Sequence, residues 1–178
     1  MRGANFERAL AFVLRVEGGY SDHPADRGGA THKGILQREY NRYRRRKELP
    51  LQAVRAIADT EVEEIYWREY WEAGRCERMP WPVNLAHFDA CVNVGVTQAA
   101  RFLQRAVDAK DDGRIGPLTL RALEEALRRD TPLCVAEKLV KQREPFYRTL
   151  VERNRSQQVF LQGWLNRVDK LKTASGIT

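Results

Sequence analysis

The chain has 178 residues, with 31 Lys and Arg against 24 Asp and Glu, a formal net charge of +7 and 43% hydrophobic residues. A chain of this length buries roughly 70% of its unfolded surface and does not depend on disulfides to fold. Its three cysteines, Cys76, Cys91 and Cys134, are odd in number and lack paired metal-ligand spacing, so we expect reduced core thiols and no metal. No segment approaches about 18 uninterrupted apolar residues, which excludes a helix that spans a membrane.

The N-terminus runs directly into an amphipathic helix without an apolar signal core, so we expect synthesis in the cytoplasm and no stable membrane insertion. The basic charge favours a polyanionic partner. The run Arg42–Lys47 is the best candidate for contact with nucleic acid, but only Tyr43 within it could stack on a base. We therefore expect this run to be a solvated face, and we expect no nucleic-acid partner.

The first predicted helix spans about Asn5 to Glu17, with Asn5 as its cap. Glu17 falls on the same face as the apolar side chains, where another apolar residue is due. Gly18 and Gly19 end the helix, so Glu17 lies in the last turn near the negative end of the helix dipole. Both burial and the dipole disfavour the ionised carboxylate, and we expect a raised pKa suited to a general acid.

After the helix, Pro24 and several glycines demand turns, so the next residues form a loop or small hairpin that returns over the helix end. The loop carries Asp22 and Asp26, and either could lie near Glu17. Two carboxyl groups that flank a cleft are the arrangement that glycosidases use.

The stretch resembles the catalytic signature of glycoside hydrolase family 108, the N-acetylmuramidases of phage endolysins and bacterial secretion-activator proteins. The resemblance is carried by Glu-Gly-Gly-Tyr at 17–20, Asp-x-Gly-Gly-x-Thr at 26–31 and Gly-Ile at 34–35. It implies a mostly α, lysozyme-like fold with a small loop or β-hairpin after the catalytic helix. It also implies hydrolysis of the β-1,4 bond between N-acetylmuramic acid and N-acetylglucosamine, without a cofactor.

The resemblance assigns roles to particular residues. Glu17 would donate the proton to the leaving oxygen, and Asp26, assisted by Thr31, would position water or stabilise the oxocarbenium-like transition state. Asp22 is the alternative second carboxylate. The order Glu, Asp, Thr is similar to the triad of phage lysozymes, although the spacing from Asp26 to Thr31 is one residue shorter. Four residues are expected to bind substrate: Tyr20, Asp22, His32 and Asn93.

The rest of the chain reads as helices, with no repeat and no further strand pattern. Expected helices span about 35–46, 51–58, 60–71, 83–94, 98–111, 117 onward, 132–154 and 157–172, and the tail after Thr173 is expected to fray. Thr60 and Glu63 form a potential capping box. Tyr and Trp residues at 66–71 could stack on sugars, but a core position is the more common role for such side chains.

Phe88–Gly95 reproduces the family pattern Phe-Asp-x-x-Val-Asn-x-Gly, which places Asp89 and Asn93 on one helical face. Asn93 is expected either to bind an N-acetyl sugar or to have a structural role. Asp112–Thr119 resembles the turn of helical peptidoglycan-binding modules. We therefore expect a catalytic lysozyme-like part at 1–95 and a peptidoglycan-binding-like helical part at 96–178, packed on each other, with one compact domain as the alternative.

The resulting hypothesis is a monomeric peptidoglycan hydrolase with lysozyme activity, a phage endolysin that reaches the cell wall through a holin or a secretion system. Anionic wall or outer-membrane polymers are candidate further partners. Two alternatives remain open: a lytic transglycosylase, which leaves an anhydro sugar, and a non-catalytic wall-binding secretion accessory.

Overall fold

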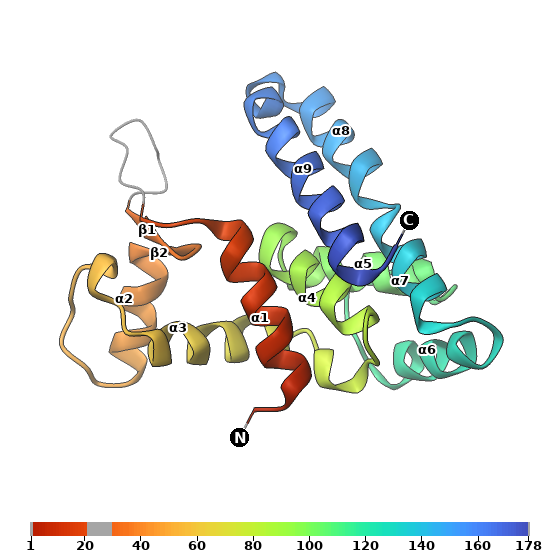
Figure 1. Cartoon of the computed structure of the whole chain (residues 1–178), viewed down its shortest axis with the longest axis horizontal. Coiled ribbons are helices and arrows are strands. Elements are labelled where there is room, and N and C mark those ends of the chain that lie inside the picture. Colours follow the sequence, from red (N-terminus) through yellow and green to blue (C-terminus); the bar gives the residue numbers. More distant parts are fainter. Residues whose placement is uncertain (1, 21–29, 178) are drawn as a thin grey trace.

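The computed structural model describes residues 2–20 and 30–177, and the chain is mostly helical with one small β-hairpin (Figure 1). This confirms the predicted fold class. The bounds of the elements are α1 Ala4–Glu17, β1 Thr31–His32, β2 Ile35–Leu36, α2 Gln37–Arg46, η1 Val54–Ala56, α3 Asp59–Tyr66, η2 Trp67–Glu72, η3 Cys76–Arg78, α4 Val83–Val94, α5 Val96–Ala106, α6 Pro117–Arg129, α7 Pro132–Val140, α8 Arg143–Arg153, η4 Arg155–Gln157 and α9 Gln158–Ser175.

Helix α4 lies at the centre of the molecule and packs against α1, α5, α7 and α9. Every residue from Val83 to Cys91 is buried. A helix that is apolar on all sides is stable only when other elements surround it. Its polar residues are therefore in the core, and the charged one, Asp89, needs partners there. The predicted bounds of this helix, 83–94, are confirmed.

The hairpin follows α1 in the chain, and Thr31 pairs with Leu36 and His32 with Ile35 in antiparallel register. The two residues of the turn, Lys33 and Gly34, have φ values of 50° and 76°. Positive φ at both central residues is the type I′ geometry that matches the twist of a two-residue hairpin. The helix expected from Ile35 therefore begins two residues later, because Ile35 and Leu36 belong to the strand.

Several further helix predictions are wrong in detail. Only the short η1 forms within the helix expected at 51–58, and the helix expected at 98–111 is α5, which ends at Ala106. Helix α1 begins at Ala4 after Gly3, so Asn5 is not its cap. Helix α3 begins at Asp59, and the carboxylate of Glu61, not that of Glu63, accepts from the N-terminal backbone, at 3.1 Å from the Ala58 nitrogen. The helix expected at 132–154 is broken into α7 and α8, and the break directs Arg143 into the core, where it is fully buried.

The C-terminus is held more firmly than predicted. Helix α9 continues to Ser175, and the Ile177 side chain packs into the hydrophobic core with only 9% of its surface exposed. Figure 1 shows α8 and α9 side by side as a pair that rises from the body of the molecule. None of the helices in the described ranges is long and apolar enough to cross a bilayer.

The turn at Asp112–Thr119 is held by a buried glutamine. The side-chain nitrogen of Gln104 donates to the Asp112 carboxylate at 2.8 Å and to the Thr119 hydroxyl at 3.1 Å, and its oxygen accepts from the Gly113 nitrogen at 2.9 Å. The polar groups that define this motif are thus occupied in fixing the turn. Helix α6 starts at Pro117, as predicted.

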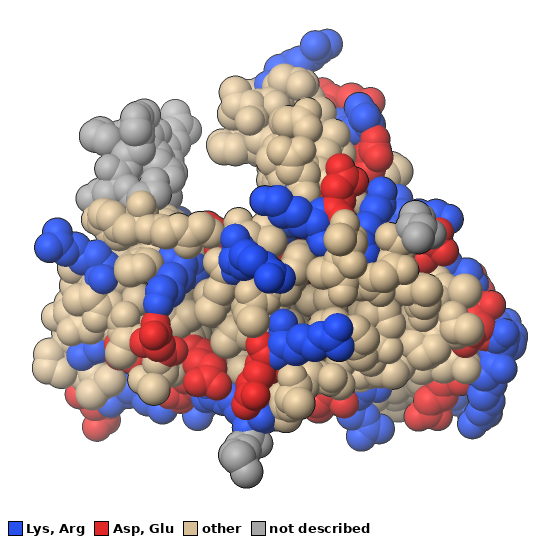
Figure 2. Space-filling model, viewed as in Figure 1, with Lys and Arg blue, Asp and Glu red and all other residues tan. Residues whose placement is uncertain are grey.

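The basic run Arg42–Lys47 faces acidic side chains of α3 and the turn after it. Arg44 pairs with Glu61 at 2.7 Å, Arg46 with Glu69 at 2.8 Å and Lys47 with Glu64 at 2.5 Å. Tyr43, the one aromatic residue in the run, is buried. These pairings explain the run as part of the fold, and on the face drawn in Figure 2 basic and acidic side chains are interspersed.

Candidate active site

Glu17 is the last residue of α1, and its side chain is 20% exposed. The helix ends there because Gly18 adopts a φ of 79°. The hairpin turn lies against this helix end: a Cβ atom built on Gly34 would be 2.8 Å from Glu17 Oε2 and 2.5 Å from the Tyr66 hydroxyl. Tyr66 in turn donates to the Lys33 carbonyl at 2.8 Å. The hairpin, α1 and α3 therefore meet at Glu17.

An arginine from the other end of the chain holds the Glu17 carboxylate. Arg167 of α9 donates from Nη1 to Glu17 Oε1 at 2.6 Å and from Nε to Asp89 Oδ1 at 2.9 Å. Burial alone would lower the pKa of Arg167, but the carboxylates of Asp89 and Glu17 outweigh burial and raise it. Arg167 is thus a fixed positive charge that lies between the carboxylates of Asp89 and Glu17.

Asp89 connects this arginine to a second one. Its side chain is completely buried and also accepts from Arg143, which is equally buried. Burial would raise the pKa of Asp89, but the guanidinium groups of Arg143 and Arg167 hold it below its usual range. Buried charges persist only when they are paired and hydrogen-bonded. The four side chains Glu17, Arg167, Asp89 and Arg143, which we call the ion network, alternate in charge and join α1, α4, α8 and α9.

Asn93 extends the network toward solvent. Its side-chain oxygen accepts from Arg143 Nη2 at 3.1 Å and from the Tyr147 hydroxyl. This is the structural role that the sequence left open, and it uses the carbonyl oxygen of the amide. The substrate-binding role of Asn93 stays a prediction, which now concerns the amide nitrogen.

Aromatic side chains continue up α9 from the ion network. The Trp164 ring stacks on Tyr147 with centroids 5.0 Å apart, and Phe160 lies 6.0 Å from Trp164. Phe160, Trp164 and Arg167 follow helical spacing, so they share one face of α9. Phe160 is 52% exposed. Trp164 is partly buried, so a partly exposed aromatic face leads along α9 to the arginine that holds Glu17.

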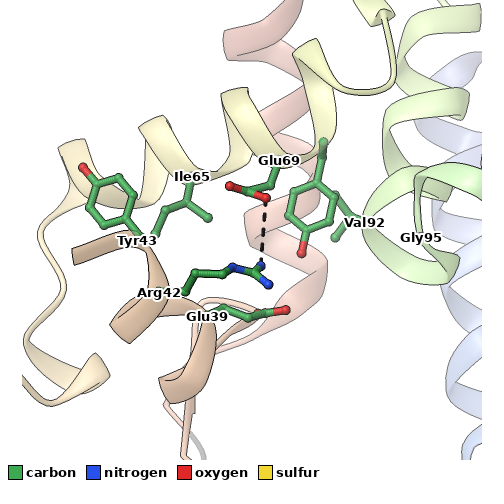
Figure 3. Close-up of a pocket in the computed structure, with 8 residues that line it drawn as sticks. Glu39, Arg42, Tyr43, Ile65, Glu69, Val92 and Gly95 are labelled. Atoms are coloured by element: carbon green, nitrogen blue, oxygen red, sulfur yellow. Dashed lines mark ion pairs between the residues drawn. The ribbon is translucent and has the colours of Figure 1, made fainter. Parts of the chain in front are cut away.

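A pocket of about 350 Å³ lies between α2, α3, η2 and the end of α4 (Figure 3). An ion pair between Arg42 and Glu69, 3.9 Å long, crosses it. Burial raises the pKa of Tyr70, and the carboxylates of Glu39 and Glu17 raise it further. Its lining residues are Glu39, Arg42, Tyr43, Ile65, Glu69, Tyr70, Val92 and Gly95.

Three other predicted site residues lie near the hairpin. Thr31 and His32 form β1, and the exposed Tyr20 packs edge-on against His32 with ring centroids 6.0 Å apart. His32 Nδ1 is buried and has no hydrogen-bond partner within residues 2–20 and 30–177. Asp22 and Asp26 lie outside the described residues, so the choice of second carboxylate stays a prediction.

We expect Gly34→Ala to reduce both stability and activity. Its φ of 76° costs an L-residue about 1–2 kcal/mol, and the new methyl group would displace Tyr66 or Glu17. Gly176→Ala is the matched control, since Gly176 has a φ of 75° but a Cβ atom added there would meet nothing within 4 Å. Thermal unfolding and reducing-end release should show a larger stability loss for Gly34→Ala and an activity loss for that variant alone. Equal behaviour of the two variants would contradict the close approach to Glu17.

The described geometry agrees with comparisons to known proteins. Residues 10–95, which include Glu17 and all of α4, match the family model described as Glycosyl hydrolase 108. The chain belongs to glycosyl hydrolase family 108 over this region. Residues 98–169 match the model described as Predicted Peptidoglycan domain. The protein is therefore a lysozyme-like glycosyl hydrolase that acts on peptidoglycan.

A solved structure is similar to this chain over most of its length. The structure of Brucella abortus SagA has a TM-score of 0.76 at 28% sequence identity, covering 96% of this hydrolase and 92% of that chain. Twelve chains of solved structures match in all. No curated protein gives a significant match.

Sequence reasoning missed the part that the C-terminal half plays in this hydrolase. Arg143 and Arg167 come from the region of the peptidoglycan-domain model, yet Arg167 contacts the glutamate of the family 108 region. The division at residue 95 stays a prediction, but the two parts share one site. The available signal was the pattern Gly163-Trp164-x-x-Arg167, which resembles the family's C-terminal half.

Proposed function

We propose that the protein is an N-acetylmuramidase that hydrolyses the β-1,4 bond between N-acetylmuramic acid and N-acetylglucosamine. The observation that carries the proposal is the position of Glu17. It is a partly exposed carboxylate at a helix end, held by Arg167 and bordered by a hairpin, within a glycosyl hydrolase 108 region. Glycosidases of this kind need one carboxyl group that protonates the leaving oxygen.

In the proposed mechanism, Glu17 is the general acid. Arg167 binds Oε1, and the backbone at Gly34 lies close to Oε2, so the carboxyl group is fixed before substrate binds. Fixed orientation of a catalytic group lowers the entropic part of the barrier. During cleavage the proton passes to the glycosidic oxygen, and Glu17 becomes an anion facing Arg167.

The second catalytic role is proposed for Asp26, with Asp22 as the alternative. Asp89, which shares Arg167 with Glu17, has another role because it is bonded to both buried arginines. In this proposal the loop carboxylate positions water or stabilises the oxocarbenium-like transition state, with Thr31 assisting. A carboxyl separation of about 5 Å would favour retention of configuration, and about 6.5–9.5 Å would favour inversion.

We further propose that the protein is a phage endolysin. It would be made in the host cytoplasm, reach the wall through a holin or a secretion system and act as a monomer. Its basic charge would favour anionic wall or outer-membrane polymers as additional contacts. Lysis of intact bacteria after inner-membrane permeabilisation would test this biological role separately from the chemistry.

The test of the chemistry is incubation of the wild-type protein with purified peptidoglycan, followed by measurement of reducing ends and mass spectrometry of the fragments. Fragments with reducing N-acetylmuramic acid ends are expected. Anhydro-muramic ends would instead identify a lytic transglycosylase, in which the muramic acid closes its own ring. Binding to peptidoglycan without any cleavage would identify a wall-binding accessory and overturn the proposal.

The aromatic face of α9 predicts a sugar-binding surface. Trp164→Ala should raise KM for peptidoglycan fragments by about tenfold with a smaller change in kcat, because a lost aromatic contact is worth about 0.5–1.5 kcal/mol beyond its area. Trp164→Phe should retain most of the affinity. Leu118→Ala, at an 83% exposed position on α6, is the control for loss of exposed apolar surface. If Trp164→Ala lowers thermal stability but leaves KM unchanged, the role of Trp164 is limited to packing on Tyr147.

A further inference from the structure

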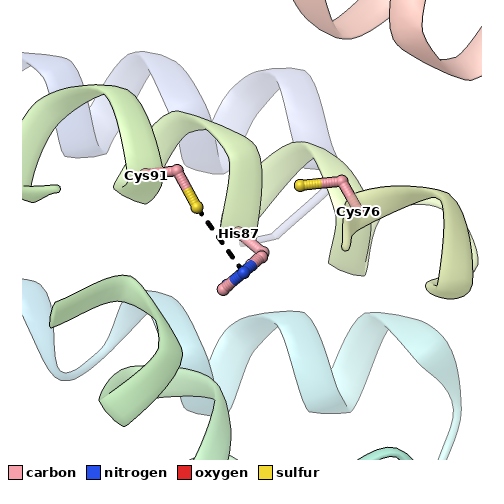
Figure 4. Close-up of side chains that lie close together, drawn as sticks. All are labelled: Cys76, His87 and Cys91. Atoms are coloured by element: carbon pink, nitrogen blue, oxygen red, sulfur yellow. Dashed lines mark hydrogen bonds between the residues drawn. The ribbon is translucent and has the colours of Figure 1, made fainter. Parts of the chain in front are cut away.

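A second cluster of reactive side chains lies in the core, apart from the ion network. Cys76 begins η3, and His87 and Cys91 lie one turn apart on α4 (Figure 4). All three are completely buried. The spacing of His87 and Cys91 places both side chains on the same face of the helix, where they meet Cys76.

The distance between Cys91 and His87 fits a tetrahedral metal site, and Cys76 lies close to both. One ligand atom from each residue lies within 4.8 Å of the other two, and Cys91 Sγ is 3.5 Å from His87 Nε2. With Zn–S bonds of about 2.3 Å and Zn–N bonds of about 2.05 Å, a sulfur and a nitrogen on one tetrahedral ion are about 3.5 Å apart. That separation is already present.

The neighbouring backbone offers a fourth ligand. The carbonyl oxygen of Gly74 is 3.1 Å from His87 Nε2. A Cβ atom on Gly74 would be 2.8 Å from Cys91 Sγ and 3.2 Å from Cys76 Sγ, so only glycine allows the backbone this close to both sulfurs. The segment follows the π-helical turn Trp67–Glu72, and such turns are frequent at functional sites.

We propose that Cys76, His87 and Cys91 bind one Zn²⁺ ion, with the Gly74 carbonyl oxygen in the fourth position. Binding releases the two thiol protons to solvent, and the two thiolates neutralise the ion, so no net charge is buried. Because the residues are fully buried, the ion enters as the chain folds. It joins the segment around Gly74 to α4, the helix that also carries Asp89 and Asn93.

Metal analysis of the full chain tests the proposal. Protein produced with added zinc and purified without a metal-affinity tag or chelator should contain about one zinc per chain. Cys76→Ser and Cys91→Ser should each lose the zinc. Cys134→Ser is the matched control, because Cys134 is exposed and outside the cluster, and it should keep the zinc.

A spectroscopic measurement on the wild type covers the case in which the cysteine variants fail to fold. Wild-type protein unfolded, stripped of metal and refolded with Co²⁺ should show the thiolate-to-cobalt and visible bands of a tetrahedral site. Absence of both zinc and cobalt bands, with three titratable thiols, would reduce the cluster to core packing. A mass lower by two hydrogen atoms, with one titratable thiol, would show a Cys76–Cys91 disulfide. Either result would overturn the proposal, and neither depends on hydrolase activity.

Discussion

Replacement of Glu17 by glutamine is expected to lower the release of reducing ends from peptidoglycan by at least about 100-fold, since general acid catalysis contributes about 10²–10⁴-fold in rate. Glutamine has the size of glutamate and keeps an oxygen that can accept from Arg167, but it has no proton of suitable acidity to give. Arg167 also retains Asp89 as a counter-charge. The fold should therefore survive the substitution, and thermal unfolding should show a small change.

The matched control is Glu7→Gln, which makes the same chemical change on the same helix at an exposed position. It should hydrolyse peptidoglycan at the wild-type rate. A rate for Glu17→Gln close to that of Glu7→Gln would remove Glu17 from the mechanism. Loss of activity together with loss of the folded state would leave a catalytic role unsupported, so both variants need to be compared by circular dichroism at the assay temperature.

The sequence could predict those parts of the site that depend on local signals. The helix end at Glu17 follows from Gly18 and Gly19, and the bounds of α4 follow from Pro82 and Gly95. The acidic position on an apolar face is a further local signal for Glu17. These features are decided within a few residues, where propensity and capping act.

The contacts that organise the site span the whole chain, which is why sequence reasoning missed them. Arg167 is 150 positions from Glu17, and Arg143 is 54 positions from Asp89. A single sequence gives the spacing of residues on one helix but not the choice of partner helix. The sequence indicates that Asp89 is a buried polar residue in need of partners, and only the packing of α8 and α9 on α4 identifies them. The break between α7 and α8, in contrast, had a local signal that was missed: Pro145 lies in the first turn of α8, and a proline does not fit the interior of one continuous helix.

The cluster of Cys76, His87 and Cys91 also could not be predicted from the sequence alone. The cysteines look scattered in the sequence because one of the three side chains of the cluster is a histidine. His87 and Cys91 have helical spacing, but Cys76 reaches them only through the turn at Gly74. The prediction that all three cysteines are in the core is wrong for Cys134, which is exposed.

Asp89→Asn is expected to be the most destabilising single substitution in the ion network. It leaves Arg143 and Arg167 in the core without the charge between them, and breaking a buried ion pair in this way costs about 3–5 kcal/mol of the free energy of unfolding. Asp169→Asn is the matched control on α9, since Asp169 is 72% exposed and 3.6 Å from Lys172. Asp169→Asn should lower the free energy of unfolding by less than about 1 kcal/mol. Denaturant unfolding of the two variants gives both values.

We also expect Asp89→Asn and Asp169→Asn to differ in how their free energy of unfolding depends on pH. The arginines hold the pKa of Asp89 below its usual range, so its stabilising contribution is fully present above its unfolded pKa of about 3.9. That contribution is lost as the pH falls through the lower, folded pKa, so the wild type and Asp169→Asn should lose stability in this acid range. The asparagine in Asp89→Asn does not bind a proton in this range. The free energy of unfolding of that variant is smaller and should therefore fall less steeply as the pH decreases. If Asp89→Asn and the wild type lose stability in parallel below pH 4, the acid sensitivity comes from other carboxylates.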